Sequence, residues 1–509
     1  MASCFVRSLS STFAIGVLML SLVTSLPVQS QPKNADELKP DFSELRKLIK
    51  AEMAARSIPS LSVAVVRRGE IVWEEAFGFA DREKGVAANQ QTMYYTASVT
   101  KAITATAIMV LHERKQIDLD RPINDYIKPM KVTSPLWNPN EATVRSVATH
   151  MSGLTTFGRN CYEDQPDCHI SAEETITRYG ILFWRPGDHF DYTNLGYGIL
   201  GEAVSRVSGK SYADFLRDEV FLPLGMTHAS LGIAPGLKEH AAVRYSSTHG
   251  RRPLAYSATP GASGVYCNAR GLALFGMFHL RAHLPSQKAI LSDKSIGMMQ
   301  NSTVAAGRGR YGMGWSVNED MNGYRGVLAQ GGTDDAMAFL QLIPSEEIAV
   351  AVLTNTGDLF PPKLVDEILS VLLPPYREKK TVAAAKKQVP DTTRPSSSFV
   401  GNWAGNVHTY RAPMPLVFSI SDSGNVQAQL GSDSVTLVNN PRFEGLGLTG
   451  RFTGKLNVDE DTGSEPYDLD FELYVKGDML YGSVTTRPRP DSRYGARLSY
   501  WVELRKRRV

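Results

Sequence analysis

A serine and a lysine at the start of an apolar stretch are the residues of this chain best suited to chemistry. Ser98 and Lys101 are three positions apart within residues 96–115, which we predict to form one helix with Ser98 in its opening turn. That spacing places both side chains on one helical face. Residues 102–111 are apolar apart from two threonines, so the helix should be buried. A buried lysine has a lowered pKa, and its neutral amine can take the proton of a serine hydroxyl.

The Ser-x-x-Lys spacing is weak evidence alone, because a second copy occurs at Ser30 and Lys33. A capping serine followed by an exposed lysine is the structural alternative. The apolar run after Lys101 and two motifs further along the chain favour a nucleophile and its base.

Two Tyr-x-Asn motifs could supply a second proton carrier, one with Tyr192 and Asn194 and one with Tyr266 and Asn268. A tyrosine can pass a proton to a leaving group and later activate water, and an asparagine amide can hold a substrate carbonyl. We select Tyr192 and Asn194, because the turn at 186–188 precedes them and a helix follows. Tyr266 precedes an apolar helix, so we expect its ring to pack in the core or in the wall of the site.

A glycine pair near the end of a predicted strand completes the candidate site, in the order Gln330, Gly331, Gly332, Thr333. Adjacent glycines allow a strand backbone to approach a ligand closely. The N–H groups of Thr333 and Ser98 could then bind a developing oxyanion. A simple irregularity of the strand is the alternative.

The elements that must position these residues form an α+β pattern. Strands are expected at both ends of residues 41–375 and helices in the middle, which predicts one antiparallel sheet flanked by helices, with a helical subdomain. The expected helices are 41–55, 96–115, 143–150, 171 onward, 195–207, 211–222 and 363–373, and the expected strands are 61–66, 70–77, 311–317, 326–330, 336–344 and 348–354.

The C-terminal part of the chain changes character. Residues 376–398 are rich in charged residues, Ala, Pro and Ser and predict a linker. Residues 399–509 contain short alternating runs separated by turn signals, typical of a small all-β barrel or sandwich. The basic run 505–508 could contact an anionic surface, although a solvated tail is the favoured interpretation.

Composition and the N-terminus limit the classes of partner. A net charge of +3 argues against a nucleic-acid partner. Residues 1–30 have the layout of a signal peptide, so we expect an exported protein, periplasmic or extracellular, without a stable membrane span; an uncleaved anchor is the alternative. Cys161 and Cys168 could form a disulfide with Cys267 left over, or all three could be free thiols. The sequence shows no metal-ligand spacing and implies no cofactor.

Taken together, these motifs resemble the serine β-lactamase and penicillin-binding-protein superfamily, in the branch of class C β-lactamases, family VIII carboxylesterases and D-aminopeptidases. The resemblance covers about residues 58–373 and is carried by 61–66, 95–101, 149–154, 186–194, 311–315, 331–332 and 353–355. It implies that Ser98 is the acylated nucleophile, Lys101 its base and Tyr192 the second proton carrier. The C-terminal part resembles the lipocalin-like barrel appended to some of these enzymes.

The chain departs from that family at the third motif. Relatives usually carry lysine or histidine where Gln330 stands, and Pro-Gly where Asp334 and Asp335 stand. A charged hydrogen bond to a substrate carboxylate contributes about 1.5–3 kcal/mol, and a neutral amide contributes less. We therefore expect a poor β-lactamase that prefers neutral or cationic acyl substrates. The alternative is that both aspartates face solvent.

These observations predict a serine hydrolase acting on small esters, amides or peptides. The alternative functions are a β-lactamase or DD-peptidase and a slow acyl-enzyme sensor that binds peptides. A further alternative concerns the C-terminal barrel, which could control the access of substrate to the site. A Ser-His-Asp site using His150 or His189 has no Gly-x-Ser-x-Gly motif to support it. The oligomeric state cannot be predicted from the sequence.

Overall fold

The computed structural model describes residues 40–165, 171–248, 250–282, 284–301, 304–306, 309–380, 394–456, 466–487 and 496–507. The predicted signal peptide at 1–30 and Cys168 lie outside these residues, as does most of the predicted linker. Helix α11 (Pro374–Lys380) takes up the first part of that linker, and Tyr376 within it is buried.

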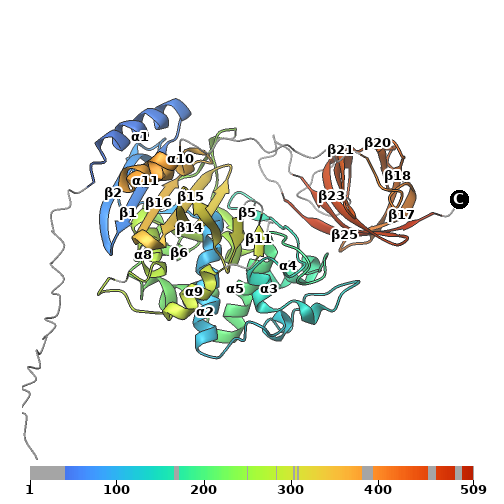
Figure 1. The fold of residues 1–509 in the computed structure, drawn as a ribbon, viewed down its shortest axis with the longest axis horizontal. Coiled ribbons are helices and arrows are strands. Elements are labelled where there is room, and N and C mark those ends of the chain that lie inside the picture. The colour runs from blue at the N-terminus through green and yellow to red at the C-terminus, as the bar shows by residue number, and fades with distance from the viewer. Residues whose placement is uncertain are drawn as a thin grey trace, which may run out of the picture. The chain divides into compact units, whose positions relative to one another are not determined.

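A nine-stranded antiparallel sheet organises the first domain (Figure 1). Its strand order is β11-β12-β13-β14-β15-β16-β1-β2-β3, so strands from the two ends of the domain join in one antiparallel sheet, as predicted, and meet where β16 pairs with β1. The strands are β1 (Ser60–Arg67), β2 (Glu70–Asp81), β3 (Val86–Ala87), β11 (Val304–Ala306), β12 (Gly309–Tyr311), β13 (Ser316–Met321), β14 (Tyr324–Thr333), β15 (Ala336–Ile343) and β16 (Ile348–Thr354).

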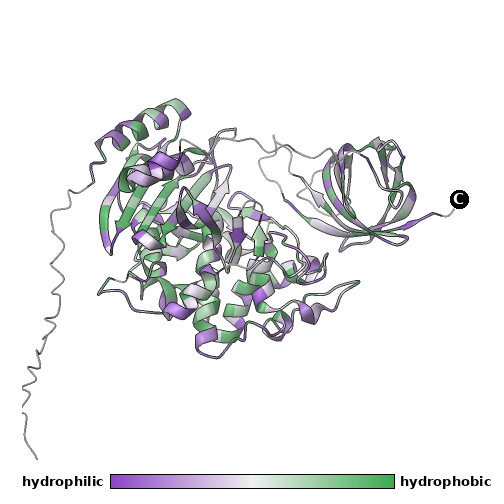
Figure 2. Ribbon diagram, in the orientation of Figure 1, coloured by the Kyte–Doolittle hydropathy of each residue, from purple (hydrophilic) through white to green (hydrophobic). Residues whose placement is uncertain are grey.

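The interior strand β1 is buried on both faces, and its side chains alternate between two cores. Val63 and Val65 belong to a cluster with α1 (Ser43–Arg56) and α10 (Phe360–Leu372). Ala64 and Val66 belong to the main core, which includes α2 (Thr100–Glu113) and α8 (Ala269–His279). Figure 2 shows the resulting apolar strands. Helices therefore cover both faces of the sheet.

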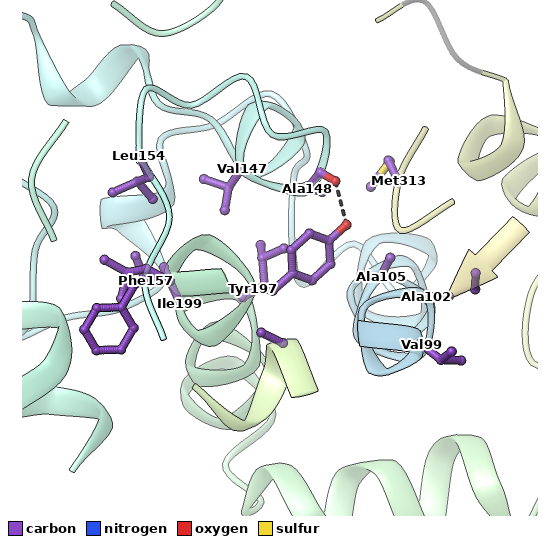
Figure 3. Close-up of a cluster of buried hydrophobic side chains, with 14 of the residues drawn as sticks. Val99, Ala102, Ala105, Val147, Ala148, Leu154, Phe157, Tyr197, Ile199 and Met313 are labelled. Atoms are coloured by element: carbon purple, nitrogen blue, oxygen red, sulfur yellow. Dashed lines mark hydrogen bonds between the residues drawn. The ribbon is translucent and has the colours of Figure 1, made fainter. Parts of the chain in front are cut away.

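The helical part between the two strand groups packs around α2. Its helices are α3 (Val144–Ala148), α4 (Ala172–Tyr179), α5 (Asn194–Ser208), α6 (Tyr212–Leu216), α7 (Pro260–Ser263) and α9 (Asp293–Gln300). Thr143 and Ser171 cap α3 and α4, at the positions where these helices were expected to begin. Tyr197 on α5 donates its hydroxyl proton to the Ala148 carbonyl over 2.6 Å, within the core shown in Figure 3.

Two predicted elements are interrupted where the chain passes close to the candidate site. The expected helix 96–115 begins as a separate 3-10 turn, Ala97–Val99, and becomes α-helical only at Thr100. The expected strand 311–317 breaks at Gly314, whose φ is 80°. A Cβ on Gly314 would lie 2.7 Å from Ala102 Cα, so only glycine allows this loop to pack on α2.

The C-terminal part is a nearly closed nine-stranded barrel, with order β20-β19-β18-β17-β25-β24-β23-β22-β21. Phe418 contacts Phe452 and Phe471 inside it, with ring centroids 5.8 and 5.0 Å apart. Its strands are β17 (Gly401–His408), β18 (Pro413–Ile420), β19 (Val426–Leu430), β20 (Thr436–Leu437), β21 (Asn439–Glu444), β22 (Gly447–Gly454), β23 (Tyr467–Lys476), β24 (Met479–Thr486) and β25 (Ser499–Lys506).

Hydrogen bonds connect the barrel to a segment of the helical part. Gly158 and Arg497 exchange backbone hydrogen bonds of 2.8 and 2.7 Å, and Ser499 Oγ donates to the Thr156 carbonyl at 2.8 Å. Along the described ranges, no helix is long and apolar enough to cross a membrane.

Candidate active site

Ser98 lies in the 3-10 turn that leads from β4 (Tyr94–Tyr95) into α2. The preceding residue, Ala97, has a φ of 44°, a conformation that non-glycine residues rarely adopt and that concentrates at functional sites. The turn is held by β10 (Val265–Cys267): the N–H and hydroxyl of Thr96 donate to the Val265 carbonyl at 2.9 and 2.8 Å, and the Thr100 hydroxyl accepts from Val265 N–H at 3.1 Å. These bonds fix the serine at the mouth of the buried helix.

Lys101 is 1% exposed, and its amine lies 3.0 Å from Ser98 Oγ. It also donates to Asn194 Oδ1 at 2.7 Å and to the Ala262 carbonyl at 3.2 Å. Burial lowers the pKa of Lys101 well below the usual value for lysine. A neutral amine has two N–H bonds and one lone pair. With both N–H bonds directed at Asn194 and Ala262, the lone pair is left for the proton of Ser98.

Tyr192 lies in the extended segment just before α5, with its ring centroid 4.6 Å from the Lys101 amine. Although 37% of the residue is exposed, burial raises the pKa of its hydroxyl to about 12, and a hydrogen bond with Ser98 opposes that rise. Tyr192 is therefore a phenol at neutral pH. Ser98, Lys101 and Tyr192, selected from the sequence, meet at one point.

His150 supports Tyr192, a role that the sequence did not reveal. Its ring lies 4.4 Å from that of Tyr192 and 4.7 Å from that of Tyr311. Its Nδ1 accepts the N–H of Thr193 at 3.1 Å. Burial holds the pKa of His150 well below its usual value, so the ring is neutral. The described hydrogen bonds of Ser98 go to Lys101 and Tyr192, so no Ser-His-Asp arrangement forms around it.

Asn194 is engaged at both ends of its amide. Its Oδ1 accepts from Lys101, and its Nδ2 donates to the Phe157 carbonyl at 2.9 Å. We expected this amide to hold a substrate carbonyl. In the structure the amide contacts Lys101 and the Phe157 carbonyl, so it also orients the lysine, and its role toward a substrate stays a prediction. Tyr266, the tyrosine not selected, is 2% exposed and packs on Tyr95 with ring centroids 5.3 Å apart.

The third motif closes over the nucleophile from the edge of β14. A Cβ on Gly331 would lie 2.4 Å from Ser98 N and 2.3 Å from the Thr96 carbonyl oxygen, so this position requires glycine. Gln330 and Gly332 are exposed at the same edge. Thr333 ends the strand, and its hydroxyl donates to Asp335 Oδ1 at 2.6 Å.

The two aspartates after Thr333 match neither the expectation that both repel an anionic substrate nor the alternative that both face solvent. Asp334 is exposed, whereas Asp335 is 2% exposed and forms ion pairs with Arg244 at 3.3 Å and Arg252 at 3.7 Å. Asp335 therefore neither faces solvent nor presents an uncompensated charge to a substrate. The repulsion of anionic substrates expected from this pair is reduced to the contribution of Asp334.

A cavity of about 380 Å³ opens at Ser98 between Tyr192 and the third motif. Its lining includes an apolar wall formed by Leu328, Ala329, Met337, Phe339, Leu359 and Pro362. Among the described residues that line it, none has a charged side chain, and Thr333 and Asp334 are not part of the lining. This apolar wall was not foreseen, because its residues come from three separate elements and have no common motif. No cluster of described residues could hold a metal ion.

A buried Ser-Lys pair beneath a tyrosine, closed by a glycine-rich strand edge, is an arrangement that could support acyl transfer to a serine. Family comparison agrees: the family described as Beta-lactamase matches residues 45–372, and the chain belongs to this family. Its members are generally serine hydrolases.

Individual relatives are distant. Protein flp of Staphylococcus aureus (strain N315) is 25% identical over 357 residues, which cover 68% of this chain and 70% of the relative. The octameric penicillin-binding protein homologue from Pyrococcus abyssi is 21% identical with a TM-score of 0.57, covering 91% of this chain and 100% of that chain. A class C beta-lactamase is 16% identical with a TM-score of 0.53, covering 68% and 97%. At these identities, the solved structures show the fold alone.

Proposed function

We propose that this protein is an exported serine hydrolase that cleaves neutral carboxylic esters through an acyl-enzyme. The observation that carries the proposal is the buried Lys101 amine, 3.0 Å from Ser98 Oγ, whose other two hydrogen-bonding positions are taken by Asn194 and Ala262. That arrangement supports a neutral lysine with its lone pair directed at the hydroxyl.

In the first step, Lys101 takes the Ser98 proton while Oγ bonds to the substrate carbonyl carbon. The carbonyl oxygen becomes an oxyanion, and we assign its stabilisation to the N–H groups of Ser98 and Thr333. The carbon–oxygen bond to the alcohol then breaks. Tyr192, a phenol with a pKa of about 12, gives the leaving oxygen its proton and is reprotonated from the Lys101 ammonium.

In the second step, water attacks the acyl carbon and passes its proton through Tyr192 to Lys101. The acyl–Oγ bond breaks, and Ser98 recovers its proton from the lysine. The enzyme returns to its initial state and the acid leaves.

The cavity supports an uncharged acyl group. Its apolar wall offers contact area to an aliphatic or aromatic chain, and the described lining places no charged side chain beside it. Gln330 contributes a neutral amide where a cationic side chain would bind a carboxylate. These features favour a simple ester over a penicillin or a D-amino-acid amide.

The proposal is tested by assaying purified protein with p-nitrophenyl butyrate, a D-amino-acid p-nitroanilide and nitrocefin, alongside intact mass. We expect fast ester turnover, weak nitrocefin turnover, and a loss of roughly 1,000-fold or more in Ser98→Ala. Ser316→Ala is the matched control, because Ser316 lines the same cavity without contacting Lys101 in the described structure. Nitrocefin turnover equal to that of the best ester would make the protein a β-lactamase. A single acylation of Ser98 without turnover would make it a sensor.

A further inference from the structure

A second and larger cavity, of about 930 Å³, lies within the same domain and does not include the catalytic residues. Arg244, Arg252 and Tyr266 line it, and all three are at most 6% exposed. The hairpin of β7 (Tyr245–Ser246) and β8 (Gly250–Arg251) places the two arginines side by side, since Arg252 N–H donates to the Arg244 carbonyl at 2.9 Å.

Arg244 is only loosely bound by the protein around it. Its guanidinium reaches Asp335 Oδ1 at 3.3 Å and the Pro253 carbonyl at 3.4 Å, and it lies 4.9 Å from the Tyr95 ring centroid. A guanidinium has five N–H donors, and charged hydrogen bonds are normally 2.7–2.9 Å long. Arg244 therefore retains donor capacity in a buried position, where unused capacity is costly.

Tyr266 provides an independent observation. Its hydroxyl is buried and makes no hydrogen bond with the described residues. Most buried polar groups are paired, so an unpaired one needs an explanation such as a bound molecule. The hydroxyl and the guanidinium line the same cavity, and both can donate to an acceptor-only group.

We propose that this cavity is an oxyanion-binding site in which Arg244 and the Tyr266 hydroxyl, with Arg252, bind the carboxylate or phosphate group of a small ligand. A planar guanidinium recognises both groups through paired hydrogen bonds. The exposed carboxylates of Glu163 and Asp164 line the same cavity, so the site selects a compact anionic group that reaches the buried arginines rather than an extended polyanion. This inference is independent of the proposed ester hydrolysis.

The test measures binding of sodium phosphate and sodium benzoate to the full protein by calorimetry and thermal shift, at constant ionic strength maintained with sodium chloride. We expect saturable binding of at least one anion. Binding of phosphate alone would identify a phosphate ligand, and binding of benzoate alone a carboxylate ligand.

Two variants localise the site. Tyr266→Phe removes only the unpaired hydroxyl and should weaken binding at least threefold, and Arg244→Gln should weaken it at least tenfold. Tyr256→Phe and Arg270→Gln, which change exposed side chains outside the lining, should bind as the parent protein does. The proposal is overturned if neither anion binds saturably, or if a folded Tyr266→Phe protein binds with unchanged affinity. Should Arg244→Gln fail to fold, Tyr266→Phe decides the question alone.

Discussion

Replacing Gly331 with alanine should cripple catalysis through one added methyl group. That methyl would lie 2.3 Å from the Thr96 carbonyl oxygen and 2.4 Å from Ser98 N, about 1 Å short of ordinary van der Waals contact. Both obstructing atoms are backbone, so the nucleophile turn or the strand edge must shift by about that distance. A displacement of about 1 Å at the reacting centre can cost roughly 100-fold in rate, or about 2.7 kcal/mol.

Gly332→Ala is a matched control on the same strand. There the added methyl would meet only the flexible side chain of Met337, at 2.9 Å from Cε and 3.1 Å from Sδ. We expect kcat/KM for p-nitrophenyl butyrate to fall roughly 100-fold in Gly331→Ala and less than about fivefold in Gly332→Ala. Urea unfolding verifies that both variants are folded, because overpacking alone costs about 1–3 kcal/mol. The reasoning is refuted if folded Gly331→Ala retains activity within threefold of the parent, or if both variants lose equally.

Three further predictions concern the base and its supports. Asn194→Leu removes an acceptor that stabilises the charged amine more than the neutral one, so the acid limb of the kcat/KM profile should move to lower pH while kcat falls. Lys101→Met should show how much burying the Lys101 amine lowers the free energy of unfolding. The pKa of Lys101 is lower in the folded protein than in the unfolded chain, so between these two pKa values the unfolded parent binds more protons than the folded parent. In that pH range the free energy of unfolding of the parent, relative to that of Lys101→Met, should rise with pH. Urea unfolding should show a rise of at most about 1.4 kcal/mol per pH unit. Ser499→Ala removes the hydrogen bond to the Thr156 carbonyl and should lower kcat by about fivefold. The melting temperature and kcat are measured on the same protein. An unchanged kcat would show that the barrel does not support catalysis.

The sequence predicts most of the sheet because each strand can be identified from its own pattern of apolar residues. β1 and β16 are continuous apolar runs between turn residues, and the structure places them side by side in the interior of the sheet. In the barrel, β17 and β21 carry only a weak strand signal. The first contains Gly401 and Gly405, and β21 is largely polar, so neither shows a clear alternation.

The sequence identifies chemical groups better than it identifies their partners. Ser98 and Lys101 are found by local spacing, and Tyr192 by its place before a helix. The neighbours that set their state lie far along the chain: Asn194 is 93 positions from Lys101, and Ala262 is 161 positions from it. Likewise, the burial of Asp335 depends on Arg244, which is 91 residues away. Such pairings arise only from the tertiary fold, so the sequence cannot supply them.

A chain of hydrogen bonds connects the barrel to Lys101. Asn194 can orient the Lys101 amine only if its own amide is fixed, and it is fixed by donating to the Phe157 carbonyl. The residues on either side of Phe157 are bonded to the barrel, Thr156 through Ser499 and Gly158 through Arg497. Each bond contributes only about 1 kcal/mol, but together they hold both residues that flank Phe157. Three successive hydrogen-bonded contacts therefore link the barrel to Lys101, and through them the barrel can influence the position of the lysine amine.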